Sequence, residues 1–506
     1  MKNSKLWTIL CIVVLVLQVV AEALTAAIIL RLNVLPDKYT VVLAAVLGLL
    51  GLITGLLLFA HGKKTVGTVR RVIACILALL IVSGCALISK VAADAYQTIH
   101  AVTNGETTNA RNMYVFVRVD DPAQSLADTA DYPYAIVGDY DVEHTERAIA
   151  LVEEYTGEAL AITQHTKFSE VADALYAGQA DAVILNGASV VLLMEDEAYA
   201  DFTEKARILY TVPLTQLEDP EPSTQPEQTD PPAVKKTVTN APFIVYISGS
   251  DTRSASLNVS RSDVNILMVV NPVTKQVLLL NTPRDYYVPN PAGNGKLDKL
   301  THCGLYGTDC SIEALEGLYE LEVDYYAQIN FTGFETLIDA IGGITVYSDQ
   351  AFTARETYIQ KGENYLTGTE ALDFARERYH VSGGDNGRGK NQMKVIQAVI
   401  EKATTGTTII SNYSGILSSL EGMFKTSLSM DDISQLVKMQ LSDMASWNVK
   451  SFAVTGTGGS EKTYSAPGDY AYVMYPDEDV AAYAGELVER VIAGEILTQE
   501  DITLPK

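Results

Sequence analysis

Three long apolar runs open the chain and are its clearest pattern of hydrophobic and polar positions. They cover Leu6 to Leu30, Tyr39 to Ala60 and Val72 to Ser89. Each run is long enough to cross a bilayer as a helix, and together they are too many and too long for a cleaved signal peptide. We therefore expect residues 1–92 to form three transmembrane helices. Glu22 lies inside the first run, so we expect a protonated or partner-bonded side chain between helices, with a functional group in the bilayer as the alternative.

Basic residues around these runs predict how the chain crosses the membrane. The loop between the first two runs carries only Arg31 and Lys38, beside Asp37. The chain start and the loop between the second and third runs are richer in basic residues, namely Lys2, Lys5, Lys63, Lys64, Arg70 and Arg71. Loops rich in Lys and Arg stay in the cytoplasm, so the chain after Lys90 is expected outside the cell membrane.

Short apolar runs alternate with helical spacing in residues 93–215. The expected strands are Tyr114 to Val117, Ala135 to Val137, Ala159 to Ile162 and Ala182 to Leu185, and the expected helices are Glu146 to Tyr155 and Phe168 to Leu175. This alternation predicts a small α/β accessory domain. The segment from Leu175 to Ala182 resembles one lobe of extracytoplasmic solute-binding proteins, and a plain spacer domain is the alternative.

A segment rich in Pro, Thr and acidic residues, Asp219 to Pro232, separates this domain from the rest of the chain. Such a composition cannot bury a core, so residues 216–240 are expected to form an extended linker. A second folded domain, 241–506, follows. It begins with three expected strands, Phe243 to Gly249, Val264 to Val270 and Lys275 to Thr282.

These three strands end or begin beside charged residues. If they run antiparallel, Asp251, Asp263 and Arg284 meet at one sheet edge. Two facing carboxylates repel unless a cation lies between them, and oxygen ligands completed by a substrate phosphate suit Mg²⁺, with Mn²⁺ as the alternative. Each aspartate alone is more typical of a turn, but the set together with Arg261 and Arg284 favours a metal and phosphate site.

A basic stretch from Leu366 to Gln392 adds Arg376, Arg378, Arg388 and Lys390. Its pattern predicts a helix from Thr369 to Tyr379, ended by Gly383 and Gly384, and a second helix that starts near Asp385 or Asn386. Arg388 and Gln392 then share one face at i and i+4. Guanidinium groups at helix ends bind phosphate well; solvated arginines or ion-pair partners are the alternative.

The net charge of the chain argues against nucleic acid as a partner. Residues 1–92 hold nine Lys and Arg against Glu22 and Asp37, a net charge of plus 7; the whole chain carries minus 25, so the exported part carries minus 32. Such a surface repels nucleic acid, which is not expected as a partner.

Cys303 and Cys310 lie outside the membrane, where a disulfide is the leading expectation and a metal site with His302 is the alternative.

Seven ordered motifs in the second domain resemble the LytR-CpsA-Psr family, and the similarity covers about residues 243 to 400. Ordered motifs together are far more specific than any one of them. They are Gly249-Ser250-Asp251-Thr252-Arg253, Arg261-Ser262-Asp263, Thr282-Pro283-Arg284-Asp285, Asp298-Lys299-Leu300, Asp339-Ala340-Ile341-Gly342-Gly343-Ile344, Leu366-Thr367-Gly368-Thr369-Glu370-Ala371-Leu372, and Arg376-Glu377-Arg378 with Asp385, Gly387-Arg388 and Gln392.

The resemblance implies a membrane-anchored α/β protein of a Gram-positive bacterium, with an extracytoplasmic α-β-α catalytic domain built on a central mixed sheet. It implies a phosphotransferase that moves an anionic glycopolymer, such as teichoic acid or capsule, from undecaprenyl pyrophosphate to a peptidoglycan sugar hydroxyl. The metal-site aspartates of the family fall on Asp251 and Asp263. Its pyrophosphate-binding residues fall on Arg261, Arg284, Lys299, Arg376, Arg378, Arg388 and Gln392.

The chain departs from the family pattern at one basic position, where Asn391 stands in place of the usual arginine; Lys390 is expected to compensate. Within the implied reaction, Arg284 and Arg388 are the expected catalytic arginines and Asp285 the expected general base.

An apolar slot for the lipid is expected among Leu315, Leu318, Tyr319, Phe331, Phe334, Leu337 and Ile338, for which ordinary core is the alternative. The alternative functions are a lipid-pyrophosphate glycan hydrolase and a non-catalytic polyprenyl-phosphate binding or signalling protein.

Overall fold

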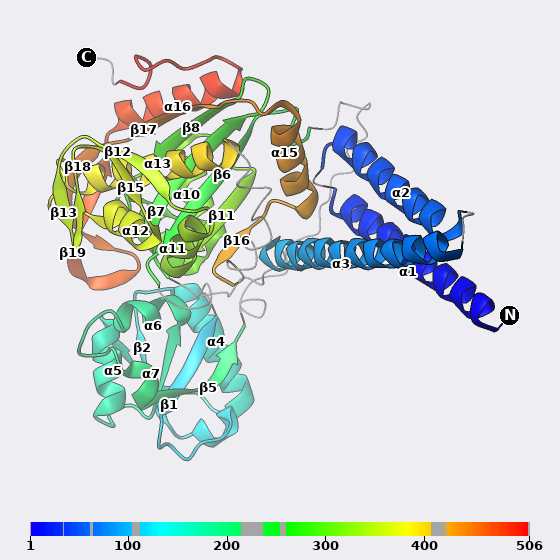
Figure 1. The fold of residues 1–506 in the computed structure, drawn as a ribbon. Coiled ribbons are helices and arrows are strands. Elements are labelled where there is room, and N and C mark those ends of the chain that lie inside the picture. The colour runs from blue at the N-terminus through cyan, green and yellow to red at the C-terminus, as the bar shows by residue number, and fades with distance from the viewer. Residues whose placement is uncertain are drawn as a thin grey trace, which may run out of the picture.

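The computed structural model describes residues 2–33, 35–60, 64–103, 112–213, 236–252, 260–405, 420 and 422–503. Most of the expected linker and Arg253 lie outside the described residues. Figure 1 shows three long helices, a small α/β body and a larger body that carries the C-terminus.

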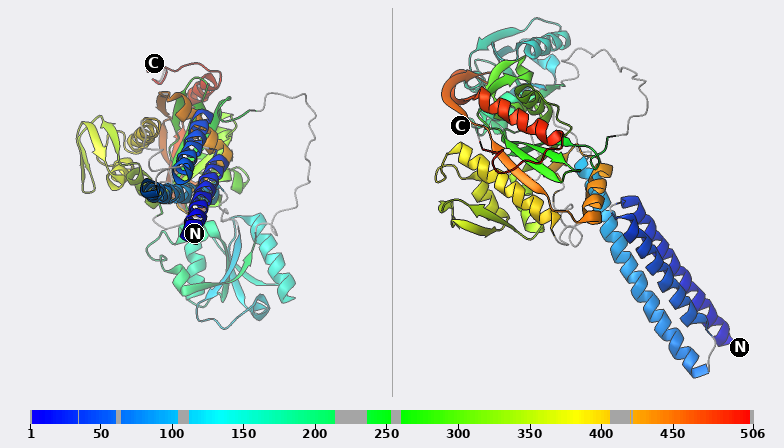
Figure 2. Two further views of the ribbon diagram at one scale, coloured as in Figure 1. Left: turned by 45° about the vertical axis from the view of Figure 1, so that its right-hand side comes forward. Right: turned by 90° about the horizontal axis from the view of Figure 1, so that it is seen from above.

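The three N-terminal helices confirm the predicted apolar spans. They are α1 (Lys2–Leu32), α2 (Asp37–Phe59) and α3 (Lys64–Thr103), and each has a stretch long and apolar enough to cross a membrane: Trp7–Arg31, Asp37–Phe59 and Gly67–Ala93. Glu22 is buried and accepts a hydrogen bond from Gln18 Nε2 at 2.8 Å. It is therefore partner-bonded, as expected. The three helices extend together away from the folded bodies (Figure 2).

Residues 112–213 form the accessory domain, a five-stranded sheet in the order β3-β2-β4-β1-β5. The predicted strands and helices are present, but the last strand was not predicted. Its strands are β1 (Met113–Arg118), β2 (Pro133–Val137), β3 (Ala161–His165), β4 (Ala182–Asn186) and β5 (Ala206–Val212). Its helices are η1 (Leu126–Thr129), α4 (Val142–Thr156), α5 (Phe168–Tyr176), α6 (Gly187–Leu193) and α7 (Phe202–Lys205).

The larger body is built on a six-stranded mixed sheet in the order β16-β11-β6-β7-β8-β17. Consecutive strands β6, β7 and β8 pair antiparallel, as predicted, whereas β11 and β17 pair parallel to β6 and β8. The strands are β6 (Phe243–Ser250), β7 (Ser262–Asn271), β8 (Gln276–Asn281), β11 (Tyr325–Asn330), β16 (Phe424–Thr426) and β17 (Asn448–Ala453).

Helices cover both faces of this sheet and give the expected α-β-α layers. Alternate strand residues face opposite layers: Ile244 and Leu278 belong to the core under α10 (Thr308–Tyr319) and α16 (Glu478–Ile492), whereas neighbouring Val245 and Leu279 belong to the core under α13 (Asp385–Thr404) and α15 (Met430–Asp443). A third, smaller core joins α11 (Phe331–Ala340) and α12 (Gly368–Arg376) to the short strands β12 (Ile344–Ser348), β13 (Phe352–Ala354), β14 (Thr357–Ile359) and β15 (Gly362–Leu366).

Two small hairpins and a turn of helix lie where the bodies meet. They comprise β9 (Tyr287–Asn290), η2 (Pro291–Gly293), β10 (Lys296–Lys299), α9 (Leu300–Cys303), η3 (Gly304–Tyr306), β18 (Gly456–Thr463) and β19 (Ala466–Pro476). Cys303 and Cys310 are both buried and are not bonded to each other in the structure, so the disulfide stays a prediction. The two thiols lie close together: a hydrogen bond with Cys310, together with burial, raises the pKa of the Cys303 thiol. Cys310 Sγ also donates to Asn290 Oδ1 at 3.4 Å.

Asp298 holds this junction together. It is fully buried and accepts hydrogen bonds from Asn290 Nδ2 (2.9 Å), the Lys299 amide (2.8 Å) and Ser465, and it pairs with His302 Nδ1 at 2.6 Å. Burial alone would raise the pKa of Asp298, but His302 and the donors lower it below its usual value. Nδ1 of His302 is thereby occupied by a carboxylate. No group of three His, Cys, Asp or Glu side chains that could hold a metal ion occurs among the described residues, so the structure gives no support to the alternative metal site with His302.

We predict that Asp298→Ala lowers the free energy of unfolding by about 3 kcal/mol, because it leaves several buried donors and His302 without their partner. The measurement is thermal and urea unfolding of the full chain in detergent. Asp309→Ala, at an exposed position in the first turn of α10, is the control and should cost less than about 1 kcal/mol. Equal stability of the two variants would contradict the structural role given to Asp298.

Candidate functional site

The end of β6, the start of β7 and the end of β8 share one sheet edge. The register pairs Gly249 with Val264, and Ile266 with Asn281. Asp251 follows β6, Asp263 lies at the start of β7 and Arg284 follows β8. Arg284 NH1 lies 2.5 Å from Asp263 Oδ1, and all three side chains line one cavity. The sequence prediction that these three residues meet is confirmed.

The basic stretch reaches the same cavity through a break between two helices. Helix α12 ends at Arg376, three residues before the predicted Tyr379. The Glu377 carboxylate ends it by accepting hydrogen bonds from the backbone amides of Tyr379 (2.6 Å) and His380 (2.9 Å), which turns the chain out of the helix. Helix α13 starts at Asp385, as predicted.

This early break settles how two arginines only two positions apart face one site. Arg376 stays in the last turn of α12, whereas Arg378 lies beyond it, and both line the cavity. Arg388 and Gln392, one turn apart on α13, also line it and are nearly buried. The predicted i and i+4 face is therefore confirmed.

The cavity has a volume of about 460 Å³ and two chemically different parts. One end gathers Asp251, Asp263 and the arginines. The rest runs between the sheet and helices α11 to α13 and is mainly apolar, with Ile247, Val264, Ile329, Phe331, Phe334, Leu372, Val395 and Ile396 in its lining. Arg355 and Asp373, whose side chains lie 3.8 Å apart, also line the cavity. Of the seven residues expected to form a lipid slot, only Phe331 and Phe334 line it; Leu315, Tyr319 and Ile338 are buried core and Leu318 and Leu337 pack beside it.

Each arginine of the cavity has a local partner. The guanidinium group of Arg376 lies 4.3 Å from the ring centre of Phe331, and that of Arg378 lies 4.8 Å from the ring centre of Tyr379. Arg388 forms an ion pair with Asp385. Burial raises the pKa of Asp385 despite this ion pair, and the nearby Asp285 adds to the increase. Such a crowded set of charges is typical of a functional site.

Asp251 and Asp263 fit a divalent cation bound with substrate oxygens. Both aspartates line the cavity. Burial, and next the negative charge of Asp263, raise the pKa of Asp251, and a cation beside the two carboxylates would oppose this increase. No group of three or more His, Cys, Asp or Glu side chains with metal-ligand geometry occurs in the part of the chain that the structure describes. Two carboxylates with open positions suit Mg²⁺ shared with phosphate.

Three predicted site residues do not line the cavity. Lys299 Nζ lies 3.1 Å from Asp285 Oδ1, and the two form a pair beside Arg284. Arg261 Nε lies 2.9 Å from Oε1 of Glu195, a residue of the accessory domain. Sequence reasoning missed Glu195 because it precedes Arg261 by 66 positions and sits in another domain, so no local pattern connects them.

The departure at Asn391 has a structural outcome. Its side chain is buried and donates from Nδ2 to the backbone oxygen of Phe374 at 3.4 Å, and it does not belong to the cavity lining. Lys390 is exposed on α13 and outside that lining, so it does not replace the missing arginine in the described structure.

Comparison with known proteins shows that residues 212–481, which include most of the larger body, match one protein family. The sequence model of the LytR_cpsA_psr family matches residues 212–481. Polyisoprenyl-teichoic acid–peptidoglycan teichoic acid transferase TagU of Bacillus cereus is 35% identical over 198 residues, covering 39% of this chain and 64% of that protein. The same enzyme of Halalkalibacterium halodurans is 32% identical over 248 residues, covering 49% and 78%, and that of Enterococcus faecalis is 35% identical over 219 residues, covering 43% and 71%.

Two solved structures are similar to about half of this chain. The crystal structure of Bacillus subtilis TagU is 28% identical and covers 51% of this chain and 100% of that one, with a TM-score of 0.39. A LytR-CPS2A-psr family protein, YwtF (TagT), with bound octaprenyl pyrophosphate lipid is 24% identical, covers 52% of this chain and 95% of that one, and has a TM-score of 0.39.

We predict that Arg376→Ala weakens binding of inorganic pyrophosphate by about ten- to a hundredfold, because one charge-assisted hydrogen-bond donor of the cavity is lost. The measurement is isothermal titration calorimetry on the full chain in detergent. Lys390→Ala removes an equal charge from the exposed side of α13 and should leave the dissociation constant within about twofold. Equal weakening by both variants would indicate a general charge effect instead of a site.

Proposed function

This chain belongs to the LytR_cpsA_psr family, and from that membership we propose that it is a phosphotransferase of cell-wall assembly. It attaches an anionic glycopolymer, carried on undecaprenyl pyrophosphate, to a sugar hydroxyl of peptidoglycan. The single observation that carries this proposal is the cavity whose arginine-rich end continues into an apolar channel. The names of the related transferases support teichoic acid as the class of glycopolymer.

The two parts of the cavity match the two parts of the proposed donor. Arginine forks bind the oxygens of pyrophosphate in pairs, and Arg284, Arg376 and Arg388 provide such forks at one end. The prenyl chain fits between the sheet and α12 and α13, where Ile247 and Ile396 are among the lining residues. One ligand with a charged head and a branched apolar tail therefore satisfies both parts.

The proposed chemistry needs no further energy source. The acceptor hydroxyl oxygen attacks the phosphorus atom that carries the glycopolymer, a new P–O bond forms, and the bridging P–O bond of the pyrophosphate breaks. The bridging electron pair leaves with undecaprenyl phosphate, whose charge Arg284 and Arg388 stabilise. The proton of the hydroxyl passes to a carboxylate, for which we propose Asp285; Lys299 holds that carboxylate beside Arg284, so the acceptor approaches from the rim of the cavity.

We propose that Asp251 and Asp263 hold Mg²⁺, with Mn²⁺ as the alternative. When bound there, the cation neutralises negative charge on the pyrophosphate. Asp263 Oδ1 lies 2.5 Å from Arg284 Nη1, so this aspartate orients the arginine and would also contribute an oxygen ligand to the cation.

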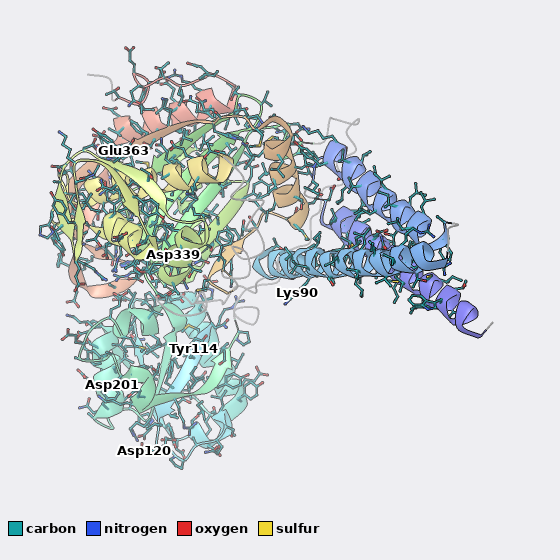
Figure 3. All side chains as sticks on the ribbon, in the orientation of Figure 1. Lys90, Tyr114, Asp120, Asp201, Asp339 and Glu363 are labelled. Carbon is teal, nitrogen blue, oxygen red and sulfur yellow. The ribbon has the colours of Figure 1, made fainter. Side chains whose placement is uncertain are left out.

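Contacts at one end of the helical bundle support an extracytoplasmic site. Asp37 and Lys38, the first two residues of α2, contact α15: Lys438 Nζ lies 2.8 Å from Asp37 Oδ1, and Lys38 Nζ donates to the Ser442 backbone oxygen at 3.2 Å. The folded bodies therefore lie at the end of the bundle opposite the basic loop between α2 and α3. Lys90, labelled in Figure 3, lies on α3 between that loop and the folded bodies. With the basic loop in the cytoplasm, both bodies lie outside.

We predict that the full chain, incubated with a lipid-pyrophosphate glycan, peptidoglycan oligomers and Mg²⁺, yields a glycan joined to peptidoglycan by a phosphodiester, detected by mass spectrometry. Omission of Mg²⁺ with added chelator should lower the yield at least tenfold, because the pyrophosphate charge is then poorly neutralised. Release of free phosphorylated glycan alone would instead indicate a hydrolase. Absence of any metal-dependent product would indicate a binding protein.

We predict that Arg284→Ala and Arg388→Ala each lower the transfer rate by about a hundredfold or more, because each removes a charge that stabilises the transition state. The same assay under single-turnover conditions measures this rate. Circular dichroism and thermal unfolding check that each variant is folded, and Lys390→Ala is the control for charge. Retained transfer in both folded variants would refute the assignment.

A further inference from the structure

Arg261 is the one predicted phosphate-binding arginine that does not line the cavity. Its Nε lies 2.9 Å from Glu195 Oε1, with 23% of the Arg261 side chain and 37% of the Glu195 side chain exposed. Glu195 follows helix α6 of the accessory domain, whereas Arg261 immediately precedes β7 of the catalytic body. The contact therefore joins the second domain to the rim of the phosphate site.

Buried hydrogen bonds fix the accessory domain in the position that makes this contact. Tyr140 Oη lies 2.7 Å from Tyr306 Oη, which lies 2.8 Å from Ser465 Oγ, and all three residues are buried. Lys167 Nζ and Asp469 Oδ1 add an exposed ion pair at 2.5 Å. Tyr140 and Tyr306 belong to one buried core that both domains share. Because separation of the domains would expose this core to water, it is disfavoured and Glu195 stays beside Arg261.

The junction also reaches the start of β7 directly. Gly304, in η3, lies so close to β7 that a Cβ atom would be 2.6 Å from the Ser262 amide. Tyr306, the tyrosine that meets the accessory domain, ends the same short helix. A short, closely packed segment therefore links the docked domain to the strand that carries Arg261 and Asp263.

Electrostatics place Glu195 at the rim of the phosphate site. Arg261 lies near enough to Asp251 to oppose the increase in its pKa. Burial raises the pKa of Glu195. The positive charges of Arg261 and Arg284 oppose this increase, and the negative charge of Asp251 adds to it. Charged residues that line the cavity therefore interact with Glu195, and Arg261 interacts with both Glu195 and Asp251.

We propose that the Glu195 carboxylate occupies the place beside the Arg261 guanidinium group where a phosphate would otherwise bind. A phosphate of the substrate displaces this carboxylate and draws Arg261 into the cavity. The accessory domain thereby sets the affinity of the site for its pyrophosphate ligand. A pyrophosphate carries more charge and more acceptor oxygens than one carboxylate, so it can replace Glu195. The inference rests on the proposed function, since it names a second-domain residue that acts on the same phosphate site.

The test measures binding of farnesyl pyrophosphate to the full chain in detergent by isothermal titration calorimetry at fixed Mg²⁺. Glu195→Gln should tighten the dissociation constant about three- to tenfold, because a partly exposed ion pair no longer competes for Arg261. Glu197→Gln, two positions away on the same exposed turn, removes an equal charge and is the matched control. It should change the constant by less than about twofold.

A double-mutant cycle with Arg261→Ala separates a contact with Arg261 from a general charge effect. In the Arg261→Ala background, Glu195→Gln should have no effect beyond about 1.5-fold. Equal tightening in both backgrounds would show that Glu195 only repels the ligand, and it would overturn the proposal. Weaker binding by Glu195→Gln, or no change in the wild-type background, would overturn it as well.

Arg284→Ala, or Arg376→Ala if the first variant is not folded, tests the site independently. Loss of farnesyl pyrophosphate binding in that variant, with no effect of Glu195→Gln, would reject the role of Glu195 and leave the proposed function in place. Unchanged binding in the arginine variant would instead reject the phosphate site itself, on which both proposals depend.

Discussion

Positive charge gathered at one end of a partly buried cavity is the constraint on which the site depends. Like charges repel strongly where water is scarce. Of the five arginines that line the cavity, Arg284, Arg376, Arg378 and Arg388 gather at this end. Each has a partner within the protein: Asp263 for Arg284, Asp385 for Arg388, and aromatic rings for Arg376 and Arg378. These partners keep the arginines in place without a ligand. The same guanidinium groups have further donors for the oxygens of the proposed pyrophosphate.

The apolar part of the cavity depends on the same layers that form the core. Sheet residues such as Ile247 and Val264 face α12 and α13 across the cavity, next to the core that holds Met393. A small displacement of these helices would close the channel or expose it to water. The channel therefore requires the third core, between α11, α12 and the short strands, to hold α12 away from the sheet.

The accessory domain belongs to the same mechanical unit. Its buried tyrosine contact with η3 joins its core to that of the catalytic body, so the two form one continuous set of buried residues. Figure 1 shows this domain against one end of the catalytic body, apart from the helical bundle. An added domain docked through buried hydroxyl groups can act on a neighbouring site through one carboxylate, with no movement of the sheet.

The sequence by itself determined the three apolar spans, the antiparallel order of β6 to β8, and the meeting of Asp251, Asp263 and Arg284. These follow from local periodicity and from the pairing of consecutive strands. It also predicted the start of α13 and the shared face of Arg388 and Gln392. Only the tertiary structure decided the end of α12, the pairing of Lys299 with Asp285, and the contact of Glu195 with Arg261. The two pairings join residues of different elements that only folding brings together, so no local pattern encodes them. The end of α12 depends on the side chain of Glu377, which accepts hydrogen bonds from the amides of Tyr379 and His380, and helical periodicity does not reveal such a contact.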